Sequence, residues 1–454
     1  MLPALLLASA LAASPTADTW AGFRNDGSGR TAATNLPVKW SPTEHIAWKI
    51  STTGYGQSSP VVWKDRVYVT SVEGEQKEKL HVCCFAVADG AKLWVKTYDA
   101  TQKGKNNPMM SRAAGTPVVD ADGISALFES GDLITLDHTG ALRWKRHFAK
   151  ELGELKNNHG LGSSLAQTDK TVIVLLDHQG PGKLIAVKKF TGLDAWAVDR
   201  TARSSWTSPV VVKDTVVVSS GGTVTGYAAA DGKQLWEMSG LIGNSIPSAA
   251  VAGDSVIIAA GENRMKPDAD GTSKSNCKIT LGGKDGYEVA WRAKKLAAGT
   301  ASPVAHAGHV YFTDKSGFVV CLDEKTGEEK FRERLDNQQW ATPIAAGDHV
   351  FFFGKDGTTT VLKTGGEFEK VASNKLWSDA DAAKRKEEAK KAAEATLPKP
   401  PEGGRGPGGG PPLPKEELDA TRYSAVGDVV YGAAAVDGAF FIRTGTELVC
   451  VRKK

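Results

Sequence analysis

Residues 208–236 read SPVVVKDTVVVSSGGTVTGYAAADGKQLW, and this stretch decides the fold. It opens with a Ser-Pro step, continues as an apolar run and turns at Asp214 into a second apolar run, Val216–Val218. This composition and spacing predict a β-hairpin. A third segment then leads to a turn at Gly232, and a fourth segment carries Trp236. The stretch therefore predicts four short strands in succession.

The same pattern recurs along the whole chain. A Ser-Pro or Thr-Pro step, or a weaker version of it, opens an apolar run at Ser59, Thr116, Ser164, Ser208, Ser248, Ser302, Thr342 and Gly432. In the outer segments an aromatic residue follows a turn glycine at a nearly fixed offset, as at Trp94, Trp144, Trp196, Trp236, Trp291 and Phe331. A unit of four strands that recurs roughly every 40 to 57 residues is typical of a β-propeller blade. The sequence predicts an all-β chain folded as an eight-bladed β-propeller.

The two ends of the chain predict how the ring closes. The last unit has only three strand-like segments, Gly432–Val436, Ala439–Arg443 and Glu447–Val451. The missing outer strand occurs at the other end as His45–Ile50, which carries Trp48. We therefore expect an N-terminal strand to complete blade eight, because this pairing leaves no open sheet edge. The outer aromatics, Trp48 included, should fill the wedges between neighbouring blades.

One stretch, residues 378–422, interrupts the pattern between blades seven and eight. Its first half, Asp379–Ala395, is rich in Ala, Lys and Glu without an apolar stripe and predicts a solvated helix. Its second half, Pro398–Pro414, is rich in Pro and Gly and predicts a flexible or extended segment. The sequence thus predicts a single propeller domain, residues 14–454, with an insertion that has no core of its own.

Residues 1–13 are typical of a secretory signal peptide. Leu2–Ala13 is apolar and rich in Leu and Ala, and Ala10-Leu11-Ala12 fits a small-x-small cleavage site. No other apolar run approaches the roughly 20 residues of a membrane span. No cysteine follows the apolar core, as lipid attachment would require. We therefore expect a periplasmic or secreted protein that is exported by a cleaved signal peptide and is neither a lipoprotein nor membrane-spanning.

Charge and cysteine content narrow the kinds of partner. The 56 basic and 52 acidic residues are spread along the chain, so no basic face suits a nucleic acid. The cysteines, which form no CxxC pair typical of zinc or thioredoxin-like chemistry, are Cys83, Cys84, Cys277, Cys321 and Cys450. We expect most of them to be buried, inert thiols. A disulfide between Cys83 and Cys84 stays open, although successive side chains of a strand point to opposite faces and disfavour it.

The repeat resembles a known family. The signature from Ser-Pro-Val-Val through Asp-Gly to Leu-Trp is similar to the PQQ-like (pyrroloquinoline quinone) repeat of quinoprotein alcohol dehydrogenases and of BamB-like propellers of outer-membrane protein assembly. The opening Trp20-Ala-Gly-Phe23-Arg24, with Trp48 and Gln57-Ser-Ser-Pro60, more particularly resembles secreted PQQ-like propellers of planctomycete-type bacteria. The resemblance covers nearly the whole mature chain outside the insertion. It implies the fold but no single function, because this scaffold hosts both enzymes and binding platforms.

Two departures from the family bear on function. The chain lacks the cysteine that tethers BamB-like lipoproteins, which argues against membrane tethering and an assembly role. It also lacks the extra loops whose Glu, Asn and Asp hold Ca²⁺ beside the quinone in the dehydrogenases. Cys83-Cys84 is similar to the vicinal disulfide of those enzymes, but it falls inside a predicted strand. We therefore expect no catalytic residue, no bound metal and no PQQ.

Residues just before each strand opening converge on one mouth of the channel in a propeller. Here they combine flat aromatic rings, amides and a fixed cation, namely Gln57, Arg112, Asn158, His159, Trp206, Asn244, Trp340 and Tyr431. Such a set suits a planar or polyhydroxylated ligand, because rings stack and polar groups fix its orientation. The alternative is that these side chains only plug the mouth, and the small number of functional pockets per protein favours it.

Two other motifs have simpler explanations than chemistry. A serine-hydrolase arrangement of Ser164 with Asp177 and His178 is disfavoured, because Ser164 opens an inner strand instead of lying on a sharp turn. Asp268–Asp270 offers two carboxylates but lacks the later oxygen ligands of a calcium loop. We interpret it as a polar excursion of blade five.

The sequence supports two functional hypotheses from different classes. The first is a non-catalytic exported β-propeller, monomeric, that acts as a binding or scaffolding module for a protein or a cell-envelope polymer. The alternative is a PQQ-dependent quinoprotein dehydrogenase with its cofactor at the central channel. The missing catalytic constellation favours the first hypothesis.

Overall fold

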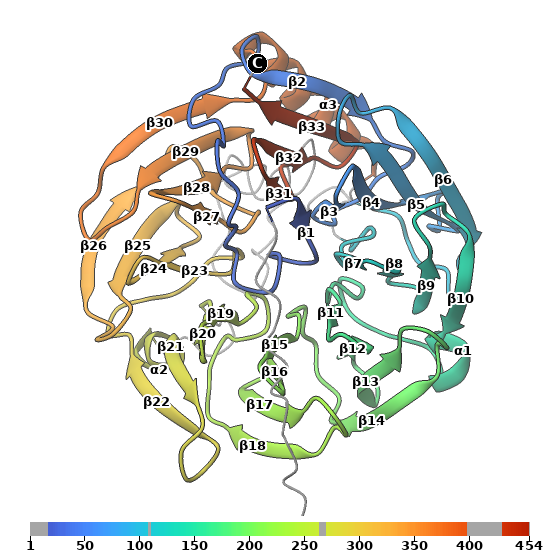
Figure 1. Cartoon of the computed structure of the whole chain (residues 1–454), viewed down its shortest axis with the longest axis vertical. Helices are drawn as coiled ribbons and strands as arrows, with labels where there is room; N and C mark the ends of the chain where they lie inside the picture. Colours follow the sequence, from blue (N-terminus) through green and yellow to red (C-terminus); the bar gives the residue numbers. More distant parts are fainter. Residues whose placement is uncertain (1–16, 108–109, 263–268, 397–428, 454) are drawn as a thin grey trace, which may run out of the picture.

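Eight antiparallel sheets stand around a central axis, each with its innermost strand near the axis and its outermost strand at the rim (Figure 1). The computed structural model describes residues 17–107, 110–262, 269–396 and 429–453. The predicted all-β fold of eight four-stranded blades is confirmed. The helices within these described ranges are α1 (Phe148–Leu152), α2 (Ala269–Ser275) and α3 (Asp379–Thr396).

The strands of each blade follow one another from the axis to the rim. Blades one to four contain β3 (Val61–Trp63), β4 (Arg66–Glu73), β5 (Lys79–Ala86), β6 (Lys92–Asp99); β7 (Val118–Asp120), β8 (Gly123–Leu127), β9 (Asp132–Leu136), β10 (Leu142–His147); β11 (Ala166–Gln167), β12 (Thr171–Leu176), β13 (Gly182–Lys188), β14 (Asp194–Arg200); and β15 (Val210–Val212), β16 (Thr215–Ser220), β17 (Thr223–Ala228), β18 (Gln234–Met238). Blades five to eight contain β19 (Ala250–Ala252), β20 (Ser255–Ile258), β21 (Cys277–Leu281), β22 (Tyr287–Arg292); β23 (Val304–His306), β24 (His309–Thr313), β25 (Phe318–Asp323), β26 (Glu329–Arg334); β27 (Ile344–Ala346), β28 (His349–Phe353), β29 (Thr358–Lys363), β30 (Lys370–Lys375); and β31 (Gly432–Val436), β32 (Ala439–Arg443), β33 (Glu447–Arg452), β2 (Ile46–Ser51).

Blade eight closes the ring as predicted. Its strand order is β2-β33-β32-β31, so its outer strand comes from the N-terminal part of the chain. The pairing of β2 with β33 is antiparallel and places Trp48 opposite Cys450 and Ile50 opposite Leu448. The outer edge of β33 is therefore paired within the ring and is not left open for another chain.

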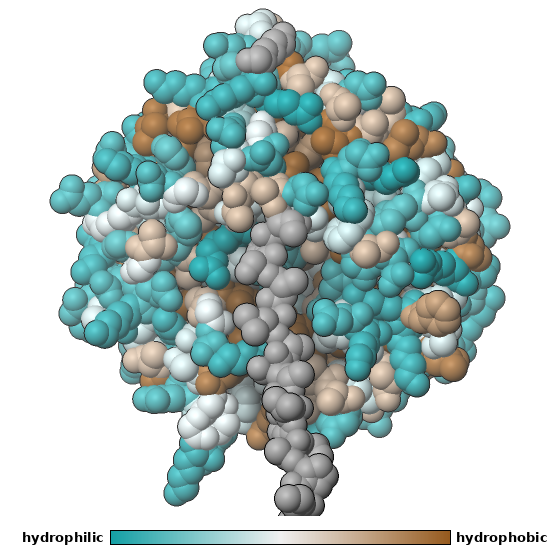
Figure 2. Space-filling view, viewed as in Figure 1, coloured by the Kyte–Doolittle hydropathy of each residue, from teal (hydrophilic) through white to brown (hydrophobic). Residues whose placement is uncertain are grey.

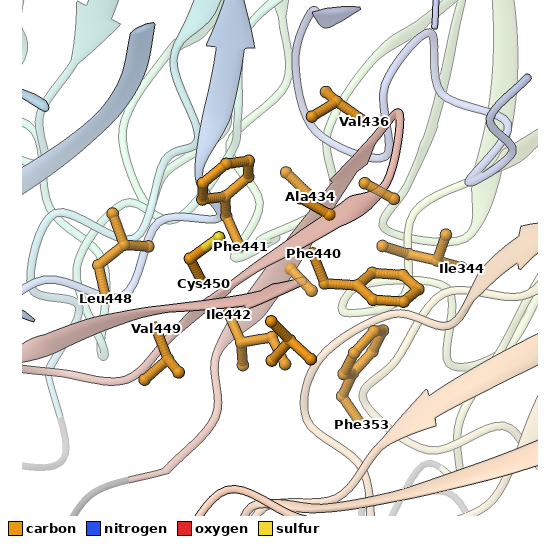
Figure 3. Packing of buried hydrophobic residues seen from close by; sticks show 14 of the residues in the cluster. Ile344, Phe353, Ala434, Val436, Phe440, Phe441, Ile442, Leu448, Val449 and Cys450 are labelled. Atoms are coloured by element: carbon orange, nitrogen blue, oxygen red, sulfur yellow. The ribbon is translucent and has the colours of Figure 1, made fainter. Parts of the chain in front are cut away.

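Apolar side chains on both faces of each sheet form the core between neighbouring blades. Figure 3 shows the contact between blades seven and eight, where Phe440 of β32 points toward Ile344 and Phe353. The ring centroids of Phe353 and Phe440 lie 5.9 Å apart. The next residue, Phe441, lies on the opposite face, and its ring centroid is 5.6 Å from that of Trp48. The alternation of the strand thus lets one sheet bury both of its faces.

The outer surface differs in character from this core. On the face shown in Figure 2, hydrophilic residues cover most of the surface and hydrophobic residues form scattered patches. Scattered apolar side chains are normal on folded proteins and need no functional explanation.

The recurring turn glycine and outer aromatic form one contact between neighbouring blades. Trp48 donates its Nε1–H to the carbonyl of Val87 in blade one at 3.2 Å, and its ring covers Gly90 so closely that a Cβ there would lie 2.8 Å away. The same cover of a glycine by the ring of the preceding blade occurs in the pairs Gly140 with Trp94, Gly192 with Trp144, Gly232 with Trp196, Gly286 with Trp236 and Gly327 with Trp291. Phe331 packs instead against Phe368, with ring centroids 5.7 Å apart. The aromatic residues therefore lie between blades, over the turn of the next blade.

A second N-terminal feature was not predicted from the sequence. Residues 17–31, which we name the N-terminal plug, enter the channel through β1 (Thr19–Trp20), which pairs with β3 and makes blade one five-stranded. Figure 1 shows β1 at the centre of the ring, beside the innermost strands.

Beyond β1 the plug follows the inner wall of the channel. The carbonyl of Ala21 accepts from Val119 N of blade two, that of Gly27 from Val251 N of blade five, and that of Gly29 from Ala345 N of blade seven, at 2.9 to 3.0 Å. These contacts lie toward the hairpin turns of the inner strands. The plug therefore occupies the end of the channel that is opposite the strand openings.

The cysteines are free and buried, as predicted for most of them. Cys83 packs in the cluster on the blade-eight side of β5, and Cys84 packs in the cluster on the blade-two side. Burial raises the pKa of both thiols, that of Cys84 to about 12. No disulfide links them in the described structure, because they belong to opposite faces of one strand.

The insertion begins with α3, and its continuation to residue 422 lies outside the described residues, as does the predicted signal peptide, residues 1–13. The predicted helix is present, but it is not fully solvated. Arg385 donates to Glu447 Oε2 at 2.7 Å, and its Cζ lies 4.6 Å from the ring centroid of Trp377. Ala382 packs against the core. None of the helices in the described part of the chain has the length and apolarity that a membrane span requires.

Candidate binding site at the channel mouth

The hydroxyl groups of the strand openings form a chain of hydrogen bonds around the channel, which we name the hydroxyl circlet. The amide of each opening residue donates to the hydroxyl of the next blade: Ser59 to Thr116 (3.0 Å), Thr116 to Ser164 (3.0 Å), Ser164 to Ser208 (2.9 Å), Ser208 to Ser248 (2.8 Å) and Ser248 to Ser302 (2.9 Å). Blade eight has Gly432 at this position, where a Cβ would lie 2.1 Å from Ser59 Oγ. The Ser and Thr of the recurring motif therefore join blades.

Two residues of the disfavoured serine-hydrolase arrangement, Ser164 and Asp177, have structural partners. Ser164 Oγ accepts the amide of Thr116, and Ser164 N donates to the next blade. Asp177 is paired with Arg200, whose Nε lies 2.8 Å from Asp177 Oδ1. Each of these groups has a partner that accounts for it structurally.

The openings of blades seven, eight, one and two bring four predicted site residues together with Tyr55, which the prediction omitted. The guanidinium of Arg112 lies 3.4 Å from the ring centroid of Tyr55. The hydroxyls of Tyr55 and Tyr431 are 2.7 Å apart, and Tyr431 meets Trp340 edge to face at 6.1 Å. Gln57 Oε1 accepts the amide of Arg112 at 2.8 Å, while Gln57 N donates to the carbonyl of Arg112 at 3.0 Å. These residues form one continuous layer, the mouth cluster.

Two further cations, Lys355 and Arg443, flank the mouth cluster. Lys355 Nζ lies 5.5 Å from the ring centroid of Trp340, and burial lowers the pKa of Lys355. Arg443 is fully buried and donates to the carbonyls of Gly56 and Thr70 at 3.4 and 3.3 Å. Burial lowers the pKa of Arg443 to about 10. Three basic side chains, Arg112, Lys355 and Arg443, therefore lie in or beside the layer that holds the three aromatic rings.

A buried ion pair positions the segment that carries Arg112. Lys77 Nζ lies 3.1 Å from Glu129 Oε1 and also donates to the carbonyl of Ser111 at 2.9 Å. The other oxygen of Glu129 accepts the amide of Ala113 at 3.0 Å. Both side chains of the pair are almost entirely shielded from solvent. The two residues on either side of Arg112 are thus fixed by one ion pair.

A second group of predicted residues lies at the openings of blades three and four. The rings of His159 and Trp206 are 5.7 Å apart, and Trp206 Nε1 donates to the carbonyl of Gly160 at 2.9 Å. Asn158 Oδ1 accepts from Gln179 at 2.7 Å. The carbonyl of His159 accepts the amide of Ser111 at 2.7 Å, which joins this group to the residue before Arg112.

Asn244 is placed differently from the other predicted site residues. Its side chain is fully buried. Its Oδ1 accepts the amide of Gly222 at 2.8 Å, and its Nδ2 donates to Ser219 Oγ and to the carbonyl of Thr223 at 3.0 and 2.8 Å. The geometry gives Asn244 a role in holding a turn of blade four.

The residues present do not fit the calcium–quinone arrangement that the resemblance implies. Within the described ranges, no three His, Cys, Asp or Glu side chains lie close enough together to hold a metal ion. Asp268 is outside those ranges, and Asp270 belongs to α2, where it pairs with Lys274 at 2.5 Å. Cys83 and Cys84 are buried within β5.

Comparisons with known proteins place the fold in a family. The family model described as "Outer membrane protein assembly factor BamB" matches residues 31–154, 149–271 and 280–398. The crystal structure of BamB from Moraxella catarrhalis has a TM-score of 0.57 and 12% identity, over 89% of this chain and 99% of that chain. No match is found among curated protein sequences.

Solved enzymes share the fold as well. A europium-containing methanol dehydrogenase has a TM-score of 0.60 and 11% identity, over 80% of this chain and 86% of that chain. The quinohemoprotein alcohol dehydrogenase from Comamonas testosteroni has a TM-score of 0.56 and 12% identity, over 96% and 80%. At such low identity these likenesses carry the fold alone, which hosts more than one function.

Proposed function

Because the chain belongs to the family described as "Outer membrane protein assembly factor BamB", we propose that it is a non-catalytic, exported propeller that binds a partner protein or an envelope polymer at its channel mouth. The mouth cluster is the observation that carries this proposal. It brings three aromatic rings and Arg112 together from the openings of four neighbouring blades, with Trp340 as its most exposed side chain.

The chemistry of the mouth cluster suits a partner with acidic and flat groups. Trp340 is 43% exposed, which is unusual for so large a ring, and it stands between Lys355 and Tyr431. Exposed Trp, Tyr and Arg are the residue types that contribute most to protein interfaces. The stacked guanidinium of Arg112 adds a fixed cation that can bind a carboxylate or stack on a planar group.

The test uses an immobilised full-length protein and an envelope extract. We expect the parent to retain a partner, and Trp340→Ala to weaken the binding of that partner, once purified, by roughly 30-fold, equivalent to about 2 kcal/mol. Leu235→Ala is the matched control, because Leu235 is 48% exposed on the outer strand of blade four. Recovery of no partner, together with turnover of an alcohol or a sugar, would overturn the proposal.

The rival function is a PQQ-dependent dehydrogenase. Its support is the fold that the chain shares with the methanol and quinohemoprotein dehydrogenases. Incubation of purified protein with PQQ and Ca²⁺, followed by desalting, separates the two proposals. Retained quinone absorbance in stoichiometric amount would favour the enzyme, and its loss would favour the binding module.

Export is also part of the proposal. Cell fractionation and N-terminal sequencing of the native protein test it directly. A mature N-terminus shortly after residue 13, in a periplasmic or secreted fraction, is the expected result, and an intact Met1 in the cytoplasm would contradict it.

A further inference from the structure

Arg24 of the N-terminal plug is a buried cation inside the channel. Its side chain is only 2% exposed, and its Nη2 donates to the carbonyl of Ala249 at 2.5 Å. Ala249 directly precedes β19, the innermost strand of blade five. Val251, two residues further on, donates its amide to the plug at Gly27. Because residues two apart in a strand direct their polar groups to the same edge, the carbonyl of Ala249 also faces the channel, and the guanidinium lies there.

The guanidinium has fewer partners than its chemistry requires. Within the described residues, Arg24 Nε and Nη1 have no hydrogen-bond acceptor. Asp26 is the acidic residue that acts on it electrostatically, but Asp26 is exposed and accepts from the amide and hydroxyl of Ser28 at 3.0 and 2.5 Å. The ring of Phe23 lies 5.0 Å away.

Burial therefore leaves a charge without compensation. Desolvation lowers the pKa of Arg24 to about 9. Because this value is still above 7, the guanidinium is charged at pH 7. A buried cation with unsatisfied donors is unfavourable unless an anion or a set of acceptors completes its environment. The backbone of Arg24 is fixed within the plug, because its carbonyl accepts the amides of Gly27 and Gly29 at 3.0 and 2.9 Å.

The hydroxyl circlet passes one residue away in sequence from the carbonyl that accepts from Arg24. Ser248, adjacent in sequence to Ala249, belongs to the hydroxyl circlet, which runs around the channel through the openings of blades one to six. Each bridging hydroxyl accepts one amide and keeps its own O–H as a donor. A fixed guanidinium and a row of hydroxyl donors are the groups that proteins use to bind carboxylates and phosphates.

We propose that Arg24 and the hydroxyl circlet form a binding site for a small oxyanion, a carboxylate or a phosphate group, deep in the channel. We expect the ligand to enter from the mouth, because the plug occupies the opposite end and is hydrogen-bonded there to several blades. The site is distinct from the mouth cluster, and it goes beyond the proposed function, which requires only contacts at the mouth.

Calorimetric titration of the full chain with inorganic phosphate and with oxalate tests the proposal, in chloride buffer of constant ionic strength. We expect saturable binding of at least one of the two probes with one site per chain, and a rise in the Tm that saturates at the same concentrations. Phosphate alone would identify a phosphate site, and oxalate alone a carboxylate site. Absence of saturable binding of both would overturn the proposal, whatever the variants do.

Variants separate a binding role of Arg24 from a structural one. Arg24→Met keeps most of the side-chain volume and removes the charge. It should lose the titration signal, and in chloride alone it should melt at or above the Tm of the parent, because an uncompensated buried charge has been removed. Arg334→Met is the matched control and should keep the titration signal, because Arg334 is an exposed residue of the outer strand β26 that stacks on Phe318 at 4.6 Å. An Arg24→Met protein that still binds the probe, or an Arg334→Met protein that does not, would contradict the assignment to the plug.

Discussion

Replacing Trp48 with alanine should destabilise the ring at the blade where it closes. Trp48 is only 9% exposed, and it is the residue of β2 that enters the core. Its ring packs against Phe441 at 5.6 Å and covers Gly90, and its Nε1–H donates to the carbonyl of Val87 at 3.2 Å. One side chain therefore joins blade eight to blade one.

The expected loss follows from these contacts. Truncation of a buried Trp to Ala costs about 3 to 5 kcal/mol, because it removes apolar burial and leaves a cavity. The hydrogen bond to Val87 accounts for about 1 kcal/mol of the difference. Trp48→Phe keeps a ring over Gly90 but has no N–H, so it should lose less than Trp48→Ala.

Urea unfolding followed by far-UV circular dichroism is the assay, with stability compared through the midpoint at constant slope. Trp340→Ala is the control of the same residue type: Trp340 is 43% exposed, and its loss should change stability by at most about 0.5 kcal/mol. If Trp48→Ala unfolded at the same urea concentration as the parent, the closing contact would contribute nothing, and the reasoning would be refuted.

Three further changes test other parts of the ring. Gly192→Ala should lower the urea midpoint more than Gly253→Ala. Both glycines have positive φ, 73° and 61°, but only at Gly192 would the new Cβ meet a ring, that of Trp144 at 2.8 Å. Equal losses of stability would show that packing of the Trp144 ring does not require glycine at this position. Cys84 should resist a thiol reagent at pH 8 until the chain is unfolded, because burial raises its pKa to about 12, and rapid labelling of the native protein would contradict the burial of this strand. Deleting residues 378–422 and joining the ends with a Gly-Ser link should lower the urea midpoint less than removal of the closing tryptophan, and a larger loss would show that the insertion stabilises the ring.

The blades could be predicted because their signals are local and repeated. The Ser-Pro openings, the turn glycines and the outer aromatics recur at similar spacing, and even the closing strand was placed correctly to within one residue, as His45–Ile50 against Ile46–Ser51. The repeat did not reveal which residue of a neighbouring blade each turn glycine and each outer aromatic contacts. Gly192 and Trp144 lie in different blades, so their contact exists only in the ring.

The candidate site could be predicted only in outline. The rule that residues just before the strand openings converge on the channel mouth identified Arg112 and Trp340, which belong to the mouth cluster. It also selected Asn244, whose side-chain amide forms its hydrogen bonds inside blade four. It missed Lys355 because this residue comes from the turn between β28 and β29 and not from an opening. The plug was missed for a similar reason: it lies outside the repeat, and its partners include residues as distant in sequence as Val251 and Ala345.

The N-terminal segment contacts the junction of blades eight and one at two places, inside the channel and at the rim of the ring. At the inner radius, Lys64 of blade one donates its amide to the carbonyl of Asp18, and Asp437 of blade eight donates to that of Ala17, at 3.0 and 2.6 Å. At the outer radius, β2 pairs with β33 and covers blade one through Trp48. The same stretch of chain thus joins blades eight and one both at the channel and at the rim. Moving the plug to admit a ligand would break the inner contacts of blades one and eight at the same time. The mouth is therefore the route to the channel that leaves the ring closed.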